Sequence, residues 1–128
     1  MLTNFIAQKL CLRQNNIQEV TGLSCLAPTL RDLDLYDNLI AHIKGVEDLV
    51  NLTSLDLSFN KIKHIKRVGH LAKLRDIYFV QNKISRIEGL DGLVNLKNLE
   101  LAANRIRVSH SNASAMNSTP QANFRNRQ

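Results

Sequence analysis

The sequence repeats itself with a period of 22 or 23 residues. The aligned segments are LCLRQNNIQEV from residue 10, LDLYDNLIAHI from 33, LDLSFNKIKHI from 55, IYFVQNKISRI from 77 and LELAANRIRVS from 99. Their shared asparagines, separated by one interval of 23 residues and three of 22, are Asn15, Asn38, Asn60, Asn82 and Asn104. Self-similarity at this period predicts stacked coils, each of which contacts only its neighbours.

The repeating unit also predicts the shape of each coil. It reads LxxLxLxxNxIxxIxxLxxLxx and is complete from Leu52 to Leu71 except for a valine at 68. Side chains alternate across a strand, so the two leucines of LxL should point inward and the residue between them outward. The asparagine amide can satisfy backbone groups at the turn that leaves the strand. The fold class is therefore expected to be α/β, a leucine-rich-repeat solenoid with a curved parallel sheet on its concave face and short helical or 3-10 arcs on its convex side.

The repeat pattern divides the chain into three parts. We expect residues 1–9 to be a partial N-terminal repeat and residues 10–107 to form the solenoid, with about five repeats. From Ser109 the sequence reads SHSNASAMNSTPQANFRNRQ, which is polar and has almost no apolar periodicity. Residues 108–128 are therefore predicted to be a disordered polar tail. Neither end shows a polar cap, so we expect a monomer with a tendency to self-associate.

Charge and composition exclude several classes of function. The net charge is +6, but no aromatic residues alternate with the lysines and arginines as a nucleic-acid stacking platform requires, so we expect no nucleic-acid binding. No apolar stretch approaches the length of a membrane span, and the N-terminus lacks the basic region of a signal peptide. We therefore expect no membrane association.

No residue pattern indicates a metal site or a catalytic site. Cys11 and Cys25 fit no metal or redox spacing and are expected to be free thiols. His42 and His64 occupy equivalent positions of neighbouring repeats, but no third ligand accompanies them. The polar positions of the repeat are explained by the solenoid, so we predict no cofactor, no metal and no enzymatic activity.

The two charge signs separate between the faces of the predicted solenoid. Six of the eleven acidic residues fall at outward strand positions, whereas the basic residues follow the asparagine. Neighbouring parallel strands lie about 4.8 Å apart, so the residues between the two leucines should form one column, namely Asp34, Asp56, Tyr78 and Glu100. Two aspartates side by side repel each other and lower stability. Folding alone therefore gives no reason for this arrangement. With the exposed aromatic Phe59 nearby, the pattern favours a protein-binding surface.

Several of these segments resemble one known family. LCLRQN, LRDLDLYDN, LDLSFN, FVQNKISRIEGL and LELAANRIR resemble consecutive early repeats of the leucine-rich-repeat regulatory subunit 7 of protein phosphatase 1, over about residues 9–107. The tail from Val108 does not resemble that family.

The resemblance implies a partner and a location. In this family the concave face of a longer, C-terminally capped solenoid binds the phosphatase catalytic subunit in nucleus and cytoplasm, through acidic and aromatic residues at the central strand position. Carried over, this implies contacts by Asp56, Tyr78 and Glu100, with Asp34 and Phe59 as neighbours of matching chemistry. The alternatives are an adaptor for another protein, cytoskeletal or from the splicing machinery, and a truncated fragment without function.

Overall fold

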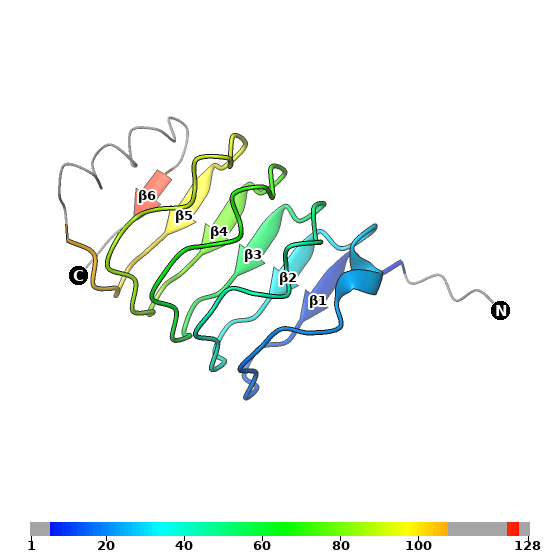
Figure 1. Ribbon diagram of the computed structural model, residues 1–128, viewed down its shortest axis with the longest axis horizontal. Helices are drawn as coiled ribbons and strands as arrows, with labels where there is room; N and C mark the ends of the chain where they lie inside the picture. The colour runs from blue at the N-terminus through cyan, green and yellow to red at the C-terminus, as the bar shows by residue number, and fades with distance from the viewer. Residues whose placement is uncertain (1–5, 108–122, 126–128) are drawn as a thin grey trace.

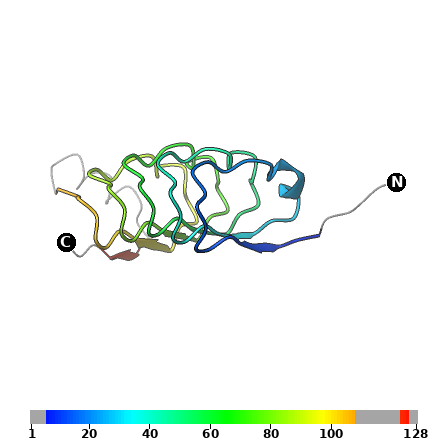
Figure 2. The same cartoon turned by 90° about the horizontal axis from the view of Figure 1, so that it is seen from below.

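The protein forms a solenoid with one continuous parallel sheet. The computed structural model describes residues 6–107 and 123–125. Six strands pair in chain order, and they are β1 (Lys9–Cys11), β2 (Asp32–Asp34), β3 (Ser54–Asp56), β4 (Asp76–Tyr78), β5 (Asn98–Glu100) and β6 (Asn123–Arg125). The strands line one side of the coil and the connecting segments return along the other side (Figures 1 and 2). The predicted leucine-rich-repeat solenoid is confirmed.

The core is built as the repeat predicts. The central residues of strands β2 to β5 are fully buried, and the flanking residues of each strand are partly exposed. The second apolar residue of this motif in the second to fifth repeats, such as Leu35 and Leu57, is at most 1% exposed, whereas Leu12 of the first repeat is partly buried. The apolar positions of the returning segments complete the same layer, so each coil covers the core of the next.

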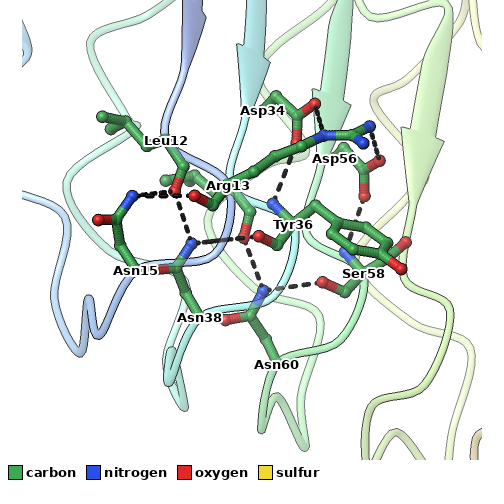
Figure 3. A network of polar contacts seen from close by, with 10 residues as sticks. Leu12, Arg13, Asn15, Asp34, Tyr36, Asn38, Asp56, Ser58 and Asn60 are labelled. Carbon is green, nitrogen blue, oxygen red and sulfur yellow. Dashed lines mark hydrogen bonds and ion pairs between the residues drawn. The ribbon is translucent and has the colours of Figure 1, made fainter.

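The ladder of asparagines joins neighbouring coils through their backbones. The Asn38 amide Nδ2 donates to the Leu35 carbonyl of its own repeat and to the Leu12 carbonyl of the preceding repeat, both at 3.0 Å. Its Oδ1 accepts a hydrogen bond from the Ile17 N–H at 3.1 Å. The same three contacts recur at Asn60, Asn82 and Asn104 (Figure 3 shows the first rungs). Buried backbone groups that the turn leaves without partners are thereby satisfied.

The returning segments contain less helix than the repeat predicts. Within the described residues the only helix is the 3-10 helix η1 (Ser24–Leu26), in the first repeat. The other returning segments are closed by single turns, such as the hydrogen bonds from Leu49 N–H to Val46 O and from Leu71 N–H to Val68 O. Short turns suffice there because each apolar residue already packs against the neighbouring coil.

A sixth strand lies in the C-terminal segment of the chain. Strand β6 pairs with β5 in parallel, and its register places Phe124 opposite Leu99. Asn123–Arg125 lies within residues 108–128, the segment that the sequence predicts to be a disordered polar tail. The rest of that segment, like residues 1–5 of the predicted partial repeat, lies outside the described residues. β6 thus adds a fifth pair of neighbouring strands after the last recognisable repeat. This is possible because strands pair through backbone hydrogen bonds, which do not require the leucines and asparagine of the repeat.

One backbone position carries an unexpected residue. Gly22, Gly45 and Gly89 occupy equivalent repeat positions and have φ between +73° and +86°. In the third repeat the equivalent residue is Arg67, with φ of +64°. A Cβ at Gly45 would lie 1.9 Å from the Val20 carbonyl oxygen, and one at Gly89 2.4 Å from that of Ile65. A Cβ at Gly22 would meet nothing within 4 Å, so the conformational reason for glycine holds in all three repeats and the steric reason at Gly45 and Gly89.

Arg67→Gly is expected to raise the free energy of unfolding by about 0.5–1 kcal/mol. Glycine adopts the left-handed conformation without strain, and the free energy gained should exceed the free energy lost with the exposed ion pair to Glu47. In that pair Arg67 Nη1 and Glu47 Oε1 lie 3.3 Å apart. Urea unfolding monitored by circular dichroism measures the change. Arg86→Gly is the control, because Arg86 is an exposed arginine outside the left-handed region and should lose stability. A loss of stability in Arg67→Gly as well would show that the ion pair dominates.

Candidate functional site

The candidate binding column forms as expected. The register of the sheet pairs Asp34 with Asp56, Asp56 with Tyr78, and Tyr78 with Glu100. All four side chains are partly exposed, on the face of the sheet opposite the buried central residues. Phe59 lies outside the column, in the turn that follows β3, and is 40% exposed. The structure thus places four of the five candidate residues in one row and the fifth beside it.

Each aspartate of the column also has a structural role. Asp34 Oδ1 accepts a hydrogen bond from the Tyr36 N–H at 3.1 Å, and Asp56 Oδ1 accepts one from the Ser58 N–H at 2.9 Å. Both contacts span two residues and fix the chain as it leaves the strand, as aspartate side chains commonly do in turns. This explains why LDL occurs in two successive repeats.

The positive charge of Arg13 lies close to two neighbouring carboxylates and offsets the repulsion between them. Its Nε donates to Asp34 Oδ2, and its Nη2 lies 4.0 Å from Asp56 Oδ2 (Figure 3). The hydrogen bond from Arg13 to Asp34, followed by the charge of that carboxylate, raises the pKa of Arg13 above its ordinary value. The interpretation that folding gives no reason for the aspartate pair is therefore wrong, because a cation from the first repeat joins both carboxylates.

An aromatic cluster adjoins the column. The rings of Tyr36 and Phe59 have their centroids 4.9 Å apart and are tilted by 46°. The Arg13 guanidinium carbon lies 4.8 Å from the centroid of the Tyr36 ring, which is the geometry of a cation–π contact. Tyr36 was not among the candidate residues, although its aromatic side chain at an outward position was a usable signal. Arg13, Tyr36 and Phe59 therefore form one contact surface next to Asp34 and Asp56.

The environment changes the proton affinity of two column residues. Burial raises the pKa of Asp56, with a further contribution from the Asp34 charge, and these effects outweigh the hydrogen bonds from Ser58 and the charge of Arg13. Burial also raises the pKa of Tyr78, and the carboxylates around it add to the shift; these are Asp76, Glu100, Asp56 and Asp32. Tyr78 is therefore a neutral phenol at physiological pH, surrounded by negative charge.

Asp56→Asn is expected to increase stability at neutral pH. Because the folded-state pKa of Asp56 is raised, its ionised form opposes folding, and this cost disappears as the pH falls through that pKa. The asparagine variant should therefore unfold at higher urea concentration than the wild type at pH 7, and the difference should vanish in acid. Asp48→Asn, at an exposed carboxylate outside the column, serves as the control. A destabilised Asp56→Asn would mean that the contact with Arg13 outweighs burial.

The described residues give no sign of a cofactor site. Among them, no three His, Cys, Asp or Glu side chains cluster as metal ligands would. Both cysteines are free and exposed. No helix in residues 6–107 or 123–125 has the length and apolar character needed to cross a bilayer. What the face offers is charge, hydrogen-bonding groups and aromatic surface, which suit recognition of another protein.

Known structures share the fold over nearly the whole chain. A leucine rich repeat family model matches residues 7–62. The crystal structure of internalin C2 from Listeria monocytogenes covers 94% of the chain with a TM-score of 0.80 and 28% identity, and the chain covers 51% of it. Internalin InlF from the same species covers 91% with a TM-score of 0.59 and 21% identity, and the chain covers 46% of it. At that identity the InlF match shows the fold alone.

Two curated relatives are similar in sequence over part of the chain. Protein phosphatase 1 regulatory subunit SDS22 of Saccharomyces cerevisiae is 54% identical over 66 residues, which is 50% of this chain and 20% of the relative. SDS22 of Schizosaccharomyces pombe is 50% identical over 45 residues, 35% of this chain and 13% of that relative. The chain thus spans well under half the length of these proteins. The chain folds as a leucine-rich-repeat solenoid, and over half of its length its sequence is similar to an SDS22 regulatory subunit of protein phosphatase 1.

Proposed function

We propose that this chain is a protein-binding scaffold that binds the catalytic subunit of protein phosphatase 1 through its concave face. The observation that carries the proposal is the in-register column of Asp34, Asp56, Tyr78 and Glu100. Its acidic and aromatic character, together with the similarity to SDS22, favours a partner with a basic surface. The scaffold acts by binding and not by catalysis, requires no cofactor, and works in nucleus and cytoplasm as a monomer with a tendency to self-associate.

Tyr78 is the strongest anchor in this proposal. Its ring is partly exposed on β4, and its hydroxyl has no hydrogen-bond partner among the described residues. Aromatic side chains with a polar tip are enriched among the residues that dominate binding energy. Asp34 and Asp56, in contrast, already contact Arg13, so a basic partner must share these carboxylates with that arginine or displace it. Phe59 extends the apolar contact area through its packing on Tyr36.

Changing the column is expected to weaken binding without unfolding the protein. Tyr78→Ala removes an aromatic anchor, and Asp56→Lys or Glu100→Lys puts a positive charge against a basic partner. Each should cost about 1–3 kcal/mol of binding free energy. Titration of labelled catalytic subunit at low and high salt measures the loss, and circular dichroism checks the fold. Lys63→Glu, at an exposed lysine outside the column, should change binding little.

Other outcomes would assign the function differently. If the column variants bind as well as the wild type while Lys63→Glu fails, the phosphatase contacts the basic residues and the column is not its site. If the wild type itself does not bind, the repeats present here are insufficient for this partner. A pulldown from nuclear and cytosolic extract then distinguishes an adaptor, which would recover a cytoskeletal or splicing protein, from a fragment without function.

A further inference from the structure

A basic groove lies beyond the asparagine turns, away from the column. It has a volume of about 720 Å³ and is formed by residues 18–19, 39, 41–44, 61, 64 and 66–67 from the first three repeats. This volume lies within the range of pockets that take small ligands or short peptide segments. None of the four column residues contributes to its lining, and neither does Phe59. The groove is therefore a separate site.

The charges that line the groove are unbalanced. Four permanent cations face it, and they are Lys44, Lys61, Lys66 and Arg67, whereas Glu19 is the only carboxylate in the lining. Within the part of the chain that the structure describes, none of the three lysine side chains forms a hydrogen bond or an ion pair. Lys44 and Lys66 also occupy equivalent positions of neighbouring repeats and so stand side by side along the solenoid. Such a row of like charges is not compensated within the described protein.

Arg67 gives a second and independent indication. Its position is glycine in three other repeats, and its backbone is left-handed, with φ of +64°. Folding would favour glycine here, yet the sequence places a guanidinium at the edge of the groove. Strained positions that persist in this way are concentrated at functional sites. The exposed ion pair with Glu47 is a weak compensation, because both side chains are open to solvent.

We infer that this groove binds an acidic peptide segment that carries an aliphatic side chain. Carboxylates of such a segment would pair with the lysines and Arg67, whose planar guanidinium can hold a carboxylate through two hydrogen bonds. The aliphatic side chain would contact Leu39, Ala41 and Ile43, which give the groove its apolar surface. No phenylalanine, tyrosine or tryptophan lines the groove, and its only rings are the imidazoles of His42 and His64, so it offers nucleic-acid bases little surface on which to stack.

Fluorescence anisotropy with the full chain tests the inference. The probe is a fluorescein-labelled peptide of glutamates around a central leucine, and the comparison peptide has glutamine in place of every glutamate. The acidic peptide should bind at least about tenfold more tightly at low salt, and the difference should shrink as salt rises. Equal affinity for the two peptides would overturn the inference.

Two variants test the groove itself. Lys66→Glu should weaken binding of the acidic peptide by about tenfold, because it replaces an attraction with a repulsion. Arg67→Gly should weaken it by about three- to fivefold, although the same change is expected to stabilise the fold. If Arg67→Gly gains stability and loses affinity for the peptide, Arg67 contacts the peptide and does not merely support the fold. Unchanged affinity in Arg67→Gly would overturn the role of that residue.

Controls decide between the groove and general charge attraction. Lys97→Glu makes the same charge change at an exposed lysine outside the groove and should alter affinity by less than about twofold. An equal loss there would show that net charge alone attracts the peptide. A single-stranded oligonucleotide of equal charge that binds more tightly, and loses affinity in Lys66→Glu, would replace the peptide as the ligand class. Tyr78→Ala should leave peptide binding intact, so this inference and the proposed phosphatase site fail independently.

Discussion

Replacing Leu57 by alanine is expected to cost about 2–5 kcal/mol of unfolding free energy and to unfold much of the protein at room temperature. Leu57 is 1% exposed and follows strand β3 in the middle of the solenoid, where it packs in the common core. In a solenoid of few coils, stability is a sum over few interfaces between neighbours, so the loss of one layer is not compensated elsewhere. Circular dichroism during urea unfolding measures the effect.

The matched control for this truncation is Val94→Ala. Val94 is 75% exposed, so shortening it should change stability by less than about 0.5 kcal/mol. A similar loss in both variants would indicate a general sensitivity to substitution, and not the core layer. A wild-type monomer with a sharp transition well above about 65 °C would contradict the expectation of marginal stability itself.

Asn60→Ala is expected to destabilise the protein by about 2–4 kcal/mol, because it leaves several buried backbone groups without partners. The Asn60 side chain is 8% exposed. Its amide donates to the carbonyls of Leu35, Leu57 and Ser58 at 3.0, 3.1 and 3.2 Å, and its Oδ1 accepts from the Ile40 N–H at 3.0 Å. The alanine variant loses hydrogen bonds within its own coil and to the preceding coil at once.

Asn15→Ala is the control for the ladder. Asn15 is exposed, and its Nδ2 donates hydrogen bonds to the Leu12 and Arg13 carbonyls of its own repeat (Figure 3). Its loss should cost less than about 1 kcal/mol. Equal losses at positions 15 and 60 would mean that each asparagine stabilises only its own turn.

The pH dependence of the stability of Asn60→Asp tests the same role of the Asn60 amide. At neutral pH one carboxylate oxygen would accept from the Ile40 N–H, but the other would face three carbonyl oxygens, and this repulsion raises the pKa of the carboxyl in the folded state. Stability should therefore recover as the pH falls through that raised pKa, because the protonated carboxyl donates one hydrogen bond. Urea midpoints measured between neutral and acidic pH give the recovery. A variant that is equally unstable at all pH values would show that packing, and not hydrogen bonding, makes asparagine necessary.

The backbone of the turns was beyond prediction from the sequence. The residue before each ladder asparagine has φ between +56° and +59°, and these residues are Gln14, Asp37, Phe59, Gln81 and Ala103. None of these residues is glycine, so the residue types did not predict the left-handed conformation. The coil imposes it, because the asparagine must turn its amide toward the carbonyls of two coils. The place of Phe59 in the repeat predicts its exposure, and this turn gives the physical reason for it.

The sequence by itself determined the coil, the sheet register and the column of Asp34, Asp56, Tyr78 and Glu100, since these depend only on contacts between equivalent positions of neighbouring repeats. Tertiary structure decided the contacts between residues at non-equivalent positions of different repeats. Arg13 reaches from the first repeat to carboxylates of the next two, and the basic groove gathers side chains from three repeats. Strand β6 pairs with β5 without a repeat of its own. The physical reason is that a period fixes which backbones become neighbours, whereas the reach of long side chains and the pairing of a sheet edge depend on the folded geometry.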